Sequence, residues 1–263
     1  IQNGRRTKSW EHDLEENKMY KSDYYFTHNS SWSEHAKKSL NAKYKEIGHI
    51  AANNFPQANH NKIKKIQWVS EWRDYKIINY RGRKIPFAIH FKKPSKFALG
   101  IIEKFCIDND LQLEIIGCSI KNIDKEKNYY KSLISKYKFL PRVNEYDSHL
   151  NISDDSIIIA HNSTFIHEAF GRGFKTAFFS IRGYFIGEKS FNFSWPQETK
   201  EMGPFWSNVP DKKQFIKILN FLKNINEKEW NLILEKYRKS IMVHDYKNTV
   251  IKDILKKEGI RID

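Results

Sequence analysis

Cysteine and long apolar runs are scarce in this chain of 263 residues, and each scarcity excludes a class of protein. The two cysteines, Cys106 and Cys118, fall in an expected helix and at an expected strand end, a spacing that suits neither a zinc site nor a disulfide framework. No run of 18 or more apolar residues is present, and no stretch resembles a signal peptide. We therefore expect a soluble protein in the reducing cytoplasm.

The sequence also lacks the usual signatures of nucleic-acid binding, namely a zinc-finger spacing, an RNA-binding aromatic motif and a basic zipper. Its formal net charge of +15 would suit a phosphate backbone. The lysines, however, are spread along the whole chain, for example over residues 125–137. This spread favours a solvated basic surface, one that can lie near anionic lipid head groups, and no specific nucleic-acid partner.

The first sixty residues predict a small β-α-β unit. Residues 23–29 and 44–50 read as strands, and residues 31–40 read as a helix that starts at Ser31 or Ser33. Residues 51–65 are polar and lack periodicity, so we expect a linker between two lobes of residues 1–58 and 59–263. The chain opens without methionine on the end of a strand, and we therefore expect the first lobe to be incomplete.

A longer alternation of strands and helices follows. The expected strands are apolar on both faces, which predicts a parallel sheet covered on its two sides and hence a doubly wound α/β fold. Three helical patterns then end the chain with no strand between them. The expected strands are 65–70, 111–119, 156–161 and 175–181; the helices are 93–110 with Ser95 as its cap, 125–137, 163–174, 211–224, 227–242 and 246–259; residues 71–86 are an expected loop.

The stretch Ala-His-Asn-Ser-Thr, residues 160–164, stands where a buried strand ends and a helix begins. Ligands of doubly wound folds bind at this edge of the sheet, and the unpaired N–H groups of a helix N-terminus favour an anion. A phosphate would fit beside Ser163 and Thr164, and Glu168 could accept hydrogen bonds from a ribose. Helix capping by Ser163 and a solvated Glu168 explain the same residues without a ligand.

Several stretches together resemble a known family. In order they are IQNGRR, YYFTHNSSWSEHAKK, KEIGHIAANN, IQWVSEWRDY, AHNSTFIHEAFGRGF and EWNLILEKYRKSIMVHDYKNT. The pattern is similar to the donor-binding segment of GT-B glycosyltransferases and of the related UDP-N-acetylglucosamine 2-epimerases and CDP-glycerol transferases. More specifically, it resembles bacterial transferases of lipopolysaccharide or capsule biosynthesis.

The resemblance implies a GT-B-like enzyme of two Rossmann-like lobes that holds a nucleotide-sugar mainly in the second lobe and a glycan or lipid-linked glycan acceptor in the first. It implies no metal and no cofactor beyond the nucleotide-sugar substrate, and a cytoplasmic location at the inner face of the membrane. Arg73 would neutralise diphosphate charge as the sugar leaves. The implied donor-binding residues are His161, Asn162, Ser163, Thr164, Glu168, Ser70, Glu71 and Arg73.

The first lobe should supply the base that takes the proton of the acceptor hydroxyl. Glu11, His12, Asp13 and His28 are the candidates, although each is also explained as a surface residue. The loop of Gln2, Asn3, Gly4 and Arg5 could face the cleft on the acceptor side.

Three functions therefore stay open at this point. The first is a glycosyltransferase that extends a surface polysaccharide or lipopolysaccharide. The second is another enzyme on the same scaffold, either a nucleotide-sugar epimerase or a CDP-polyol phosphotransferase. The third is a basic module that binds a nucleic acid or a membrane surface without chemistry.

Overall fold

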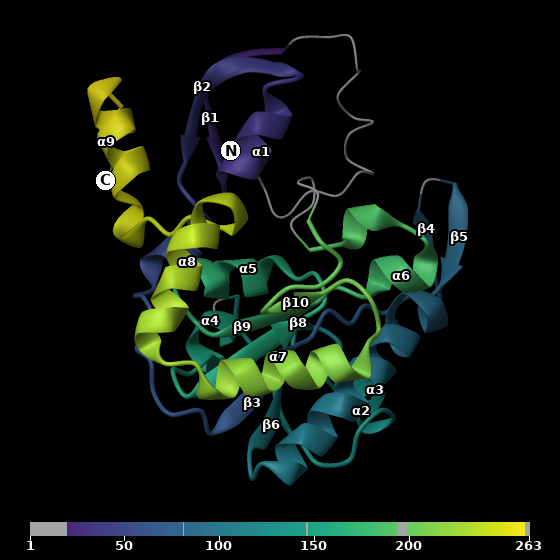
Figure 1. Ribbon diagram of the computed structural model, residues 1–263. Helices are drawn as coiled ribbons and strands as arrows, with labels where there is room; N and C mark the ends of the chain where they lie inside the picture. Colours follow the sequence, from purple (N-terminus) through teal and green to yellow (C-terminus); the bar gives the residue numbers. More distant parts are fainter. Residues whose placement is uncertain (1–19, 81, 146, 194–198, 261–263) are drawn as a thin grey trace.

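Two parallel sheets organise the computed structural model, which describes residues 20–80, 82–145, 147–193 and 199–260 (Figure 1). The smaller sheet pairs β1 (Tyr20–Thr27) with β2 (Leu40–Glu46), and α1 (Ser30–Ala36) connects them. The helix begins at Asn29, whose side-chain oxygen accepts a hydrogen bond from the Trp32 amide at 2.9 Å, and not at the predicted Ser31 or Ser33.

The larger sheet has six parallel strands in the order β10-β9-β8-β3-β6-β7. All residues of β8 and β9 are buried, so both faces of the sheet are covered at these strands. The predicted fold class, α/β with parallel sheets in two Rossmann-like lobes and a helical C-terminus, is confirmed. The strands are β3 (Lys65–Val69), β6 (Gln112–Ile116), β7 (Lys138–Leu140), β8 (Ser156–Ala160), β9 (Thr176–Phe179) and β10 (Trp206–Ser207).

The helices of the second lobe follow these strands in sequence, and α2 and α7 lie side by side (Figure 1). The helices are α2 (Lys93–Asp108), α3 (Ile123–Lys131), α4 (Asp147–Asn151), α5 (Thr164–Gly171), α6 (Arg182–Ile186), α7 (Lys212–Asn224), α8 (Glu227–Ile241) and α9 (Thr249–Lys257), with short turns η2 (Ala52–Asn54), η3 (Ala88–Lys92), η4 (Lys189–Phe191) and η5 (Tyr246–Asn248). None of the helices in the described part of the chain has the length and apolarity needed to cross a lipid bilayer.

Three local predictions are wrong. The expected loop of residues 71–86 contains an antiparallel hairpin of β4 (Ile77–Tyr80) and β5 (Arg83–Pro86). The strand β7 and the helix α4 were not expected at all. Ser95 is buried inside a helix and does not cap it, because the π-helical turn η3 extends the helix by one turn toward the N-terminus.

The last helix returns to the first lobe. In α9, Ile251 packs with Phe26 of β1 and with Ile47 just after β2, and these three residues form a small core separate from that of the large sheet. Part of the segment predicted as the second lobe, residues 59–263, thus packs against the first lobe.

The first lobe is also joined to the end of α8. The side chain of Asn29 donates to the carbonyl oxygen of Ile241 at 2.7 Å. The hydroxyls of Ser30 and Ser31 donate to the carbonyls of Lys239 and Ser240 at 3.1 and 3.0 Å. The last carbonyls of a helix have no partner within it, so α1 supplies the donors that α8 lacks.

Candidate functional site

The centre of the large sheet contains a topological switch point. The chain leaves β3 for β6 on one side, and later returns to β8 on the other side of β3. The loops that follow β3 and β8 therefore begin side by side at the carboxyl edge of the sheet. In open α/β sheets, ligands bind at such a position, outside the carboxyl ends of the strands.

A carboxylate from the first of these loops lies at the start of the second. Oε1 of Glu71 accepts hydrogen bonds from the backbone amides of Asn162 at 2.7 Å and Ser163 at 3.0 Å. These amides precede α5, where unpaired N–H groups favour negative charge. A carboxylate of the protein itself thus lies at this helix start, and binding of a donor phosphate there stays a prediction.

Arg182 provides the counter-charge. This first residue of α6 is buried, forms an ion pair with Oε2 of Glu71, and its guanidinium lies 4.8 Å from the ring centre of Phe91. Arg182 was not among the predicted site residues. Its position just after β9 was the available signal, because every strand of a parallel sheet delivers its following residues to the same edge.

The polar residues that start α5 lie where they were expected. Ser163 is the N-cap, and its hydroxyl accepts from the Phe165 amide at 3.2 Å. Ser163 and Thr164 are partly exposed, and the side chain of Asn162 donates to the carbonyl of Phe191. Their contact with a donor phosphate stays a prediction.

Two residues assigned to the cleft are instead buried below it. His161 is 1% exposed, packs edge-on against Trp68, and contacts the Phe179 carbonyl through Nδ1. Ser70 is 2% exposed, and its hydroxyl donates to the buried carboxylate of Glu126. Both predictions are wrong about exposure, because these side chains point into the core at the strand ends. Burial lowers the pKa of His161 to about 4, so this imidazole is neutral.

Arg73 is exposed and points toward the end of β6. Its Nη1 donates to the Trp72 carbonyl at 2.8 Å and to Sγ of Cys118 at 3.2 Å. A role in neutralising diphosphate charge stays a prediction for this side chain.

Glu168 lies in a second cluster, between the lobes. Its side chain is buried, with 5% of the residue exposed; Oε1 is 3.3 Å from Nδ1 of His49, and Oε2 is 3.3 Å from Nε2 of His149. His49 follows β2 of the first lobe, whereas His149 belongs to α4 of the second. The carboxylate expected to meet a ribose therefore contacts one imidazole from each lobe.

Burial keeps this cluster close to neutral. It raises the pKa of the Glu168 carboxyl to about 7, an effect that the charges of Arg172 and Arg142 reduce. Burial also lowers the pKa of His49, and it lowers that of His149 to about 3. The imidazoles are thus uncharged at neutral pH, where the Glu168 carboxyl is partly protonated.

His28 extends the cluster into the first lobe. It stands one residue after β1, is buried, and its ring centre lies 5.5 Å from that of His49 in an edge-on arrangement. The two strands of the small sheet thus each deliver one histidine to the side that faces the second lobe. The other residues considered in the first lobe lie outside the described residues: Gln2, Asn3, Gly4, Arg5, Glu11, His12 and Asp13.

Comparison with known proteins identifies the family. Residues 1–259 match the model of a family described as "putative O-antigen biosynthesis protein". The chain belongs to this family. The expected part in surface-carbohydrate biosynthesis is therefore confirmed at this level of detail. None of the curated proteins compared with the chain matches it.

Solved structures similar to this O-antigen family member include a "putative UDP-N-acetylglucosamine 2-epimerase" from Listeria monocytogenes, with 11% identity and a TM-score of 0.48 over 84% of this chain and 55% of that one. The wall teichoic acid polymerase TagF has 15% identity and a TM-score of 0.46 over 90% and 58%. A UDP-GlcNAc 2-epimerase from Neisseria meningitidis, bound to UDP-GlcNAc, has 12% identity and a TM-score of 0.40 over 75% and 45%. The chain thus spans little more than half the length of the first two structures.

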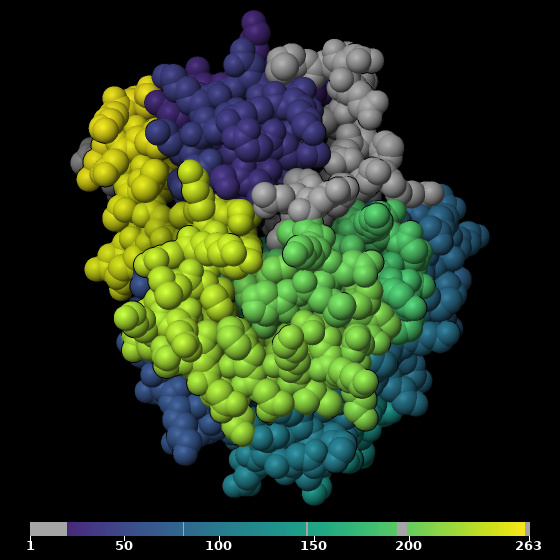
Figure 2. Space-filling model, viewed as in Figure 1, coloured from purple at the N-terminus to yellow at the C-terminus, as the bar shows by residue number. Residues whose placement is uncertain are grey.

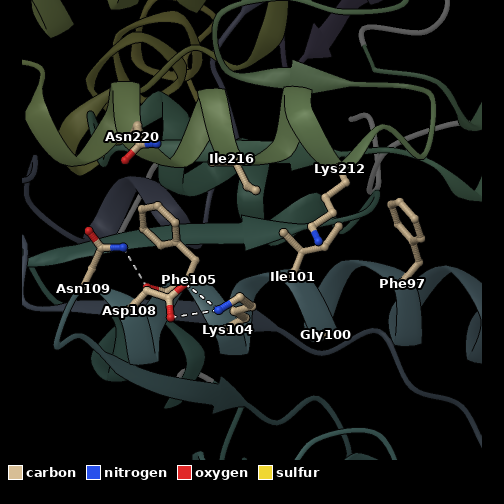
Figure 3. A pocket seen from close by; sticks show the side chains of 10 residues that line it. All are labelled: Phe97, Gly100, Ile101, Lys104, Phe105, Asp108, Asn109, Lys212, Ile216 and Asn220. Atoms are coloured by element: carbon tan, nitrogen blue, oxygen red, sulfur yellow. Dashed lines mark hydrogen bonds and ion pairs between the residues drawn. The ribbon is translucent and has the colours of Figure 1, made fainter.

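Two cavities of this family member lie away from the switch point. A groove of about 380 Å³ separates α2 from α7 (Figure 3). Its apolar wall includes Ile101, Phe105 and Ile216, and an ion pair between Lys104 and Asp108 lies at its rim. A polar cavity of about 710 Å³ lies beside the linker and the residues that precede β3 and β8, at the opposite edge of the sheet.

Among the residues that the structure describes, no group of three or more His, Cys, Asp or Glu side chains is arranged to hold a metal ion, and this includes the cluster around Glu168. The Asp-x-Asp triplet of residues 108–110 ends α2 near the amino edge of the sheet, and Asp108 pairs with Lys104 at 2.9 Å. That triplet therefore lies at the wrong edge for a metal beside a donor phosphate.

Proposed function

We propose that this protein is a glycosyltransferase of surface-polysaccharide biosynthesis that moves a sugar from a nucleotide-sugar to a growing glycan or lipid-linked glycan, without a metal. The membership in the O-antigen family supports the pathway. The observation that carries the donor site is the pair of backbone amides at Asn162 and Ser163, which already bind a carboxylate at the switch point.

The donor diphosphate would take the position that Glu71 occupies. A phosphate oxygen accepts hydrogen bonds from backbone amides as a carboxylate does, and it carries more charge. Once Glu71 is displaced, the buried guanidinium of Arg182 would pair with the diphosphate and stabilise it as the leaving group. The hydroxyls of Ser163 and Thr164 lie at the same helix end and would add donors.

The first lobe would supply the base. A neutral imidazole can accept the proton of an acceptor hydroxyl, and the lowered pKa of His49 keeps it neutral. His49 is also partly exposed, whereas its neighbour His28 is buried. We therefore assign the base to His49, with His28 and Glu168 as the groups that position it.

The donor site is tested by calorimetric titration of UDP, CDP and GDP into the native protein and the Arg182→Gln variant. We expect the variant to lose at least tenfold in affinity, because a charge-assisted hydrogen bond contributes about 1.5 to 3 kcal/mol. Arg83→Gln is the matched control, because Arg83 donates to the carbonyl of Ile186 in the same helix. Equal affinities for both variants would contradict the donor site.

The reaction is tested by incubating the protein with a panel of nucleotide-sugars, with and without surface glycans and with EDTA. Release of nucleoside diphosphate that depends on the glycan and survives EDTA is the expected result. Conversion of the sugar without any glycan would instead identify an epimerase, and transfer of a polyol phosphate would identify a phosphotransferase.

A further inference from the structure

One segment of the chain is strongly basic and contains no carboxylate. Residues 75–102 include no aspartate or glutamate, whereas Asp74 and Glu103 flank them on either side. Asp74 is already paired with Lys125 at 2.6 Å. The segment therefore carries a formal charge of +7 within a protein of +15. Its basic residues are Lys76, Arg81, Arg83, Lys84, Lys92, Lys93 and Lys96, of which Arg81 lies outside the described residues.

The hairpin within this segment has one packed face and one open face. On the packed face, Tyr80 and Ile85 contact Ile186 and Phe191 in a small core of their own. The open face contains the opposed pairs Ile77 with Pro86 and Asn79 with Lys84, all exposed. Ile77 is 56% exposed, which is unusual for an isoleucine in a strand.

Exposed cations and a tyrosine lie on the elements next to the hairpin. Lys92, Lys93 and Lys96 are exposed at the start of α2, which follows the hairpin directly. Tyr184 of α6 is 61% exposed, and Figure 1 places α6 beside the hairpin. In Figure 2 the blue segment around residues 75–100 projects at the edge of the molecule next to the green of α6. We call the open hairpin face, the start of α2 and Tyr184 the hairpin surface.

We propose that the hairpin surface docks on an anionic phospholipid bilayer. Each lysine or arginine close to such a bilayer contributes about 1 kcal/mol of attraction, and no carboxylate of the segment opposes it. Isoleucine and tyrosine side chains can enter the interface between head groups and acyl chains. A nucleic acid would use the cations but would leave Ile77 and Pro86 exposed, so the apolar side chains favour the bilayer.

Docking would also orient the proposed donor site. The hairpin follows β3, so it stands at the carboxyl edge of the sheet, as the switch point does. A protein bound through this surface holds that edge near the bilayer, where a lipid-linked acceptor would be found. This orientation rests on the proposed function, whereas the docking itself does not.

Sedimentation of the protein with vesicles tests the docking independently of any turnover. We expect binding to vesicles of phosphatidylcholine mixed with phosphatidylglycerol and little binding to phosphatidylcholine alone. Lys84→Glu/Lys93→Glu should reduce the partition coefficient by at least about 30-fold, which corresponds to ~2 kcal/mol. Lys217→Glu/Lys228→Glu, on exposed positions of α7 and α8, changes the net charge equally and should reduce it far less.

The Ile77→Asn variant tests how much the apolar side chain contributes to vesicle binding, without any change in charge. We expect this variant to bind the charged vesicles more weakly by about fivefold or more, with unchanged thermal stability, since most of the side chain is exposed. Equal losses in the two lysine pairs, equal binding to neutral vesicles, or retention on RNA that competes with vesicles and ignores Ile77→Asn would each overturn the proposal.

Discussion

At the scale of single residues, Glu71 is the group whose removal should be most informative. If its carboxylate occupies the position of the donor phosphate, Glu71→Gln removes a competing negative charge. Affinity for nucleoside diphosphates should then rise about fivefold, or ~1 kcal/mol. Calorimetry measures the affinity, and urea denaturation shows whether the loss of the ion pair with Arg182 destabilises the fold. Weaker binding of nucleoside diphosphates by a folded Glu71→Gln variant would contradict this, and would show that Glu71 supports the structure of the site.

Glu168 should make the stability of the protein depend on pH. Its pKa of about 7 in the folded state is above the value of an unfolded chain, so the folded state binds the proton more tightly. Stability from this group is complete at low pH and is lost as pH rises through 7. Glu168→Gln keeps the group neutral, and its advantage over the native protein should grow by roughly 2 kcal/mol between pH 5 and pH 8.

Urea denaturation at several pH values measures this difference. His49 and His149 titrate in both proteins, so their contributions largely cancel in the difference between the two free energies of unfolding. Glu235→Gln, an exposed change of the same kind on α8, should give curves parallel to those of the native protein. Parallel curves for Glu168→Gln as well would contradict the raised pKa.

The residues of the site show what a sequence can and cannot predict. Ser163 was identified correctly as the residue before a helix, because capping chemistry is local. His161 and Ser70 were placed in the cleft because they end strands, but whether such a side chain points outward or into the core depends on packing by distant residues such as Trp68 and Glu126. The contacts of Arg182 and Glu168 also depend on residues far away in the sequence, so they could not be predicted from it.

At the scale of elements, the junction of α1 with α8 should contribute to stability on both of its sides. Asn29 caps α1 and also donates to the last carbonyl of α8, so Asn29→Ala removes two hydrogen bonds of buried groups. We expect a loss of about 2 to 3 kcal/mol in urea denaturation. Asn226→Ala removes only the cap of α8 and should lose about 1 kcal/mol. Equal losses would show that the contact between the helices contributes nothing.

Some of the strands can be predicted from the sequence, whereas the β4–β5 hairpin cannot. Most residues of the strands β3, β6, β8 and β9 are apolar, which predicts their burial, although the polar Gln67 and Glu114 are buried with them. The β4–β5 hairpin mixes apolar residues with Lys, Arg and Asn, without alternation, over only four positions per strand, so its sequence resembles that of a charged loop. Gly82, at a φ of +74°, forms the turn, and a single glycine is a weak signal.

At the scale of the whole molecule, polar groups take part in the contacts between the linker and the second lobe. Phe55 of the linker stacks on His149 at 4.6 Å, and Nε of Arg172 donates to the Pro56 carbonyl at 3.0 Å. Interfaces of this composition allow relative movement of domains more readily than apolar ones. The polarity of residues 51–65 predicted a linker, but the residues that this linker contacts could not be predicted from the sequence.

The return of α9 to the first lobe has a consequence for synthesis on the ribosome. The partner of Phe26 and Ile47, Ile251, is translated about two hundred residues after them. At usual elongation rates this delay is roughly 10 to 40 s. During that interval the nascent first lobe exposes apolar side chains that α9 covers in the folded protein, so chaperones that hold emerging chains have a defined segment to bind.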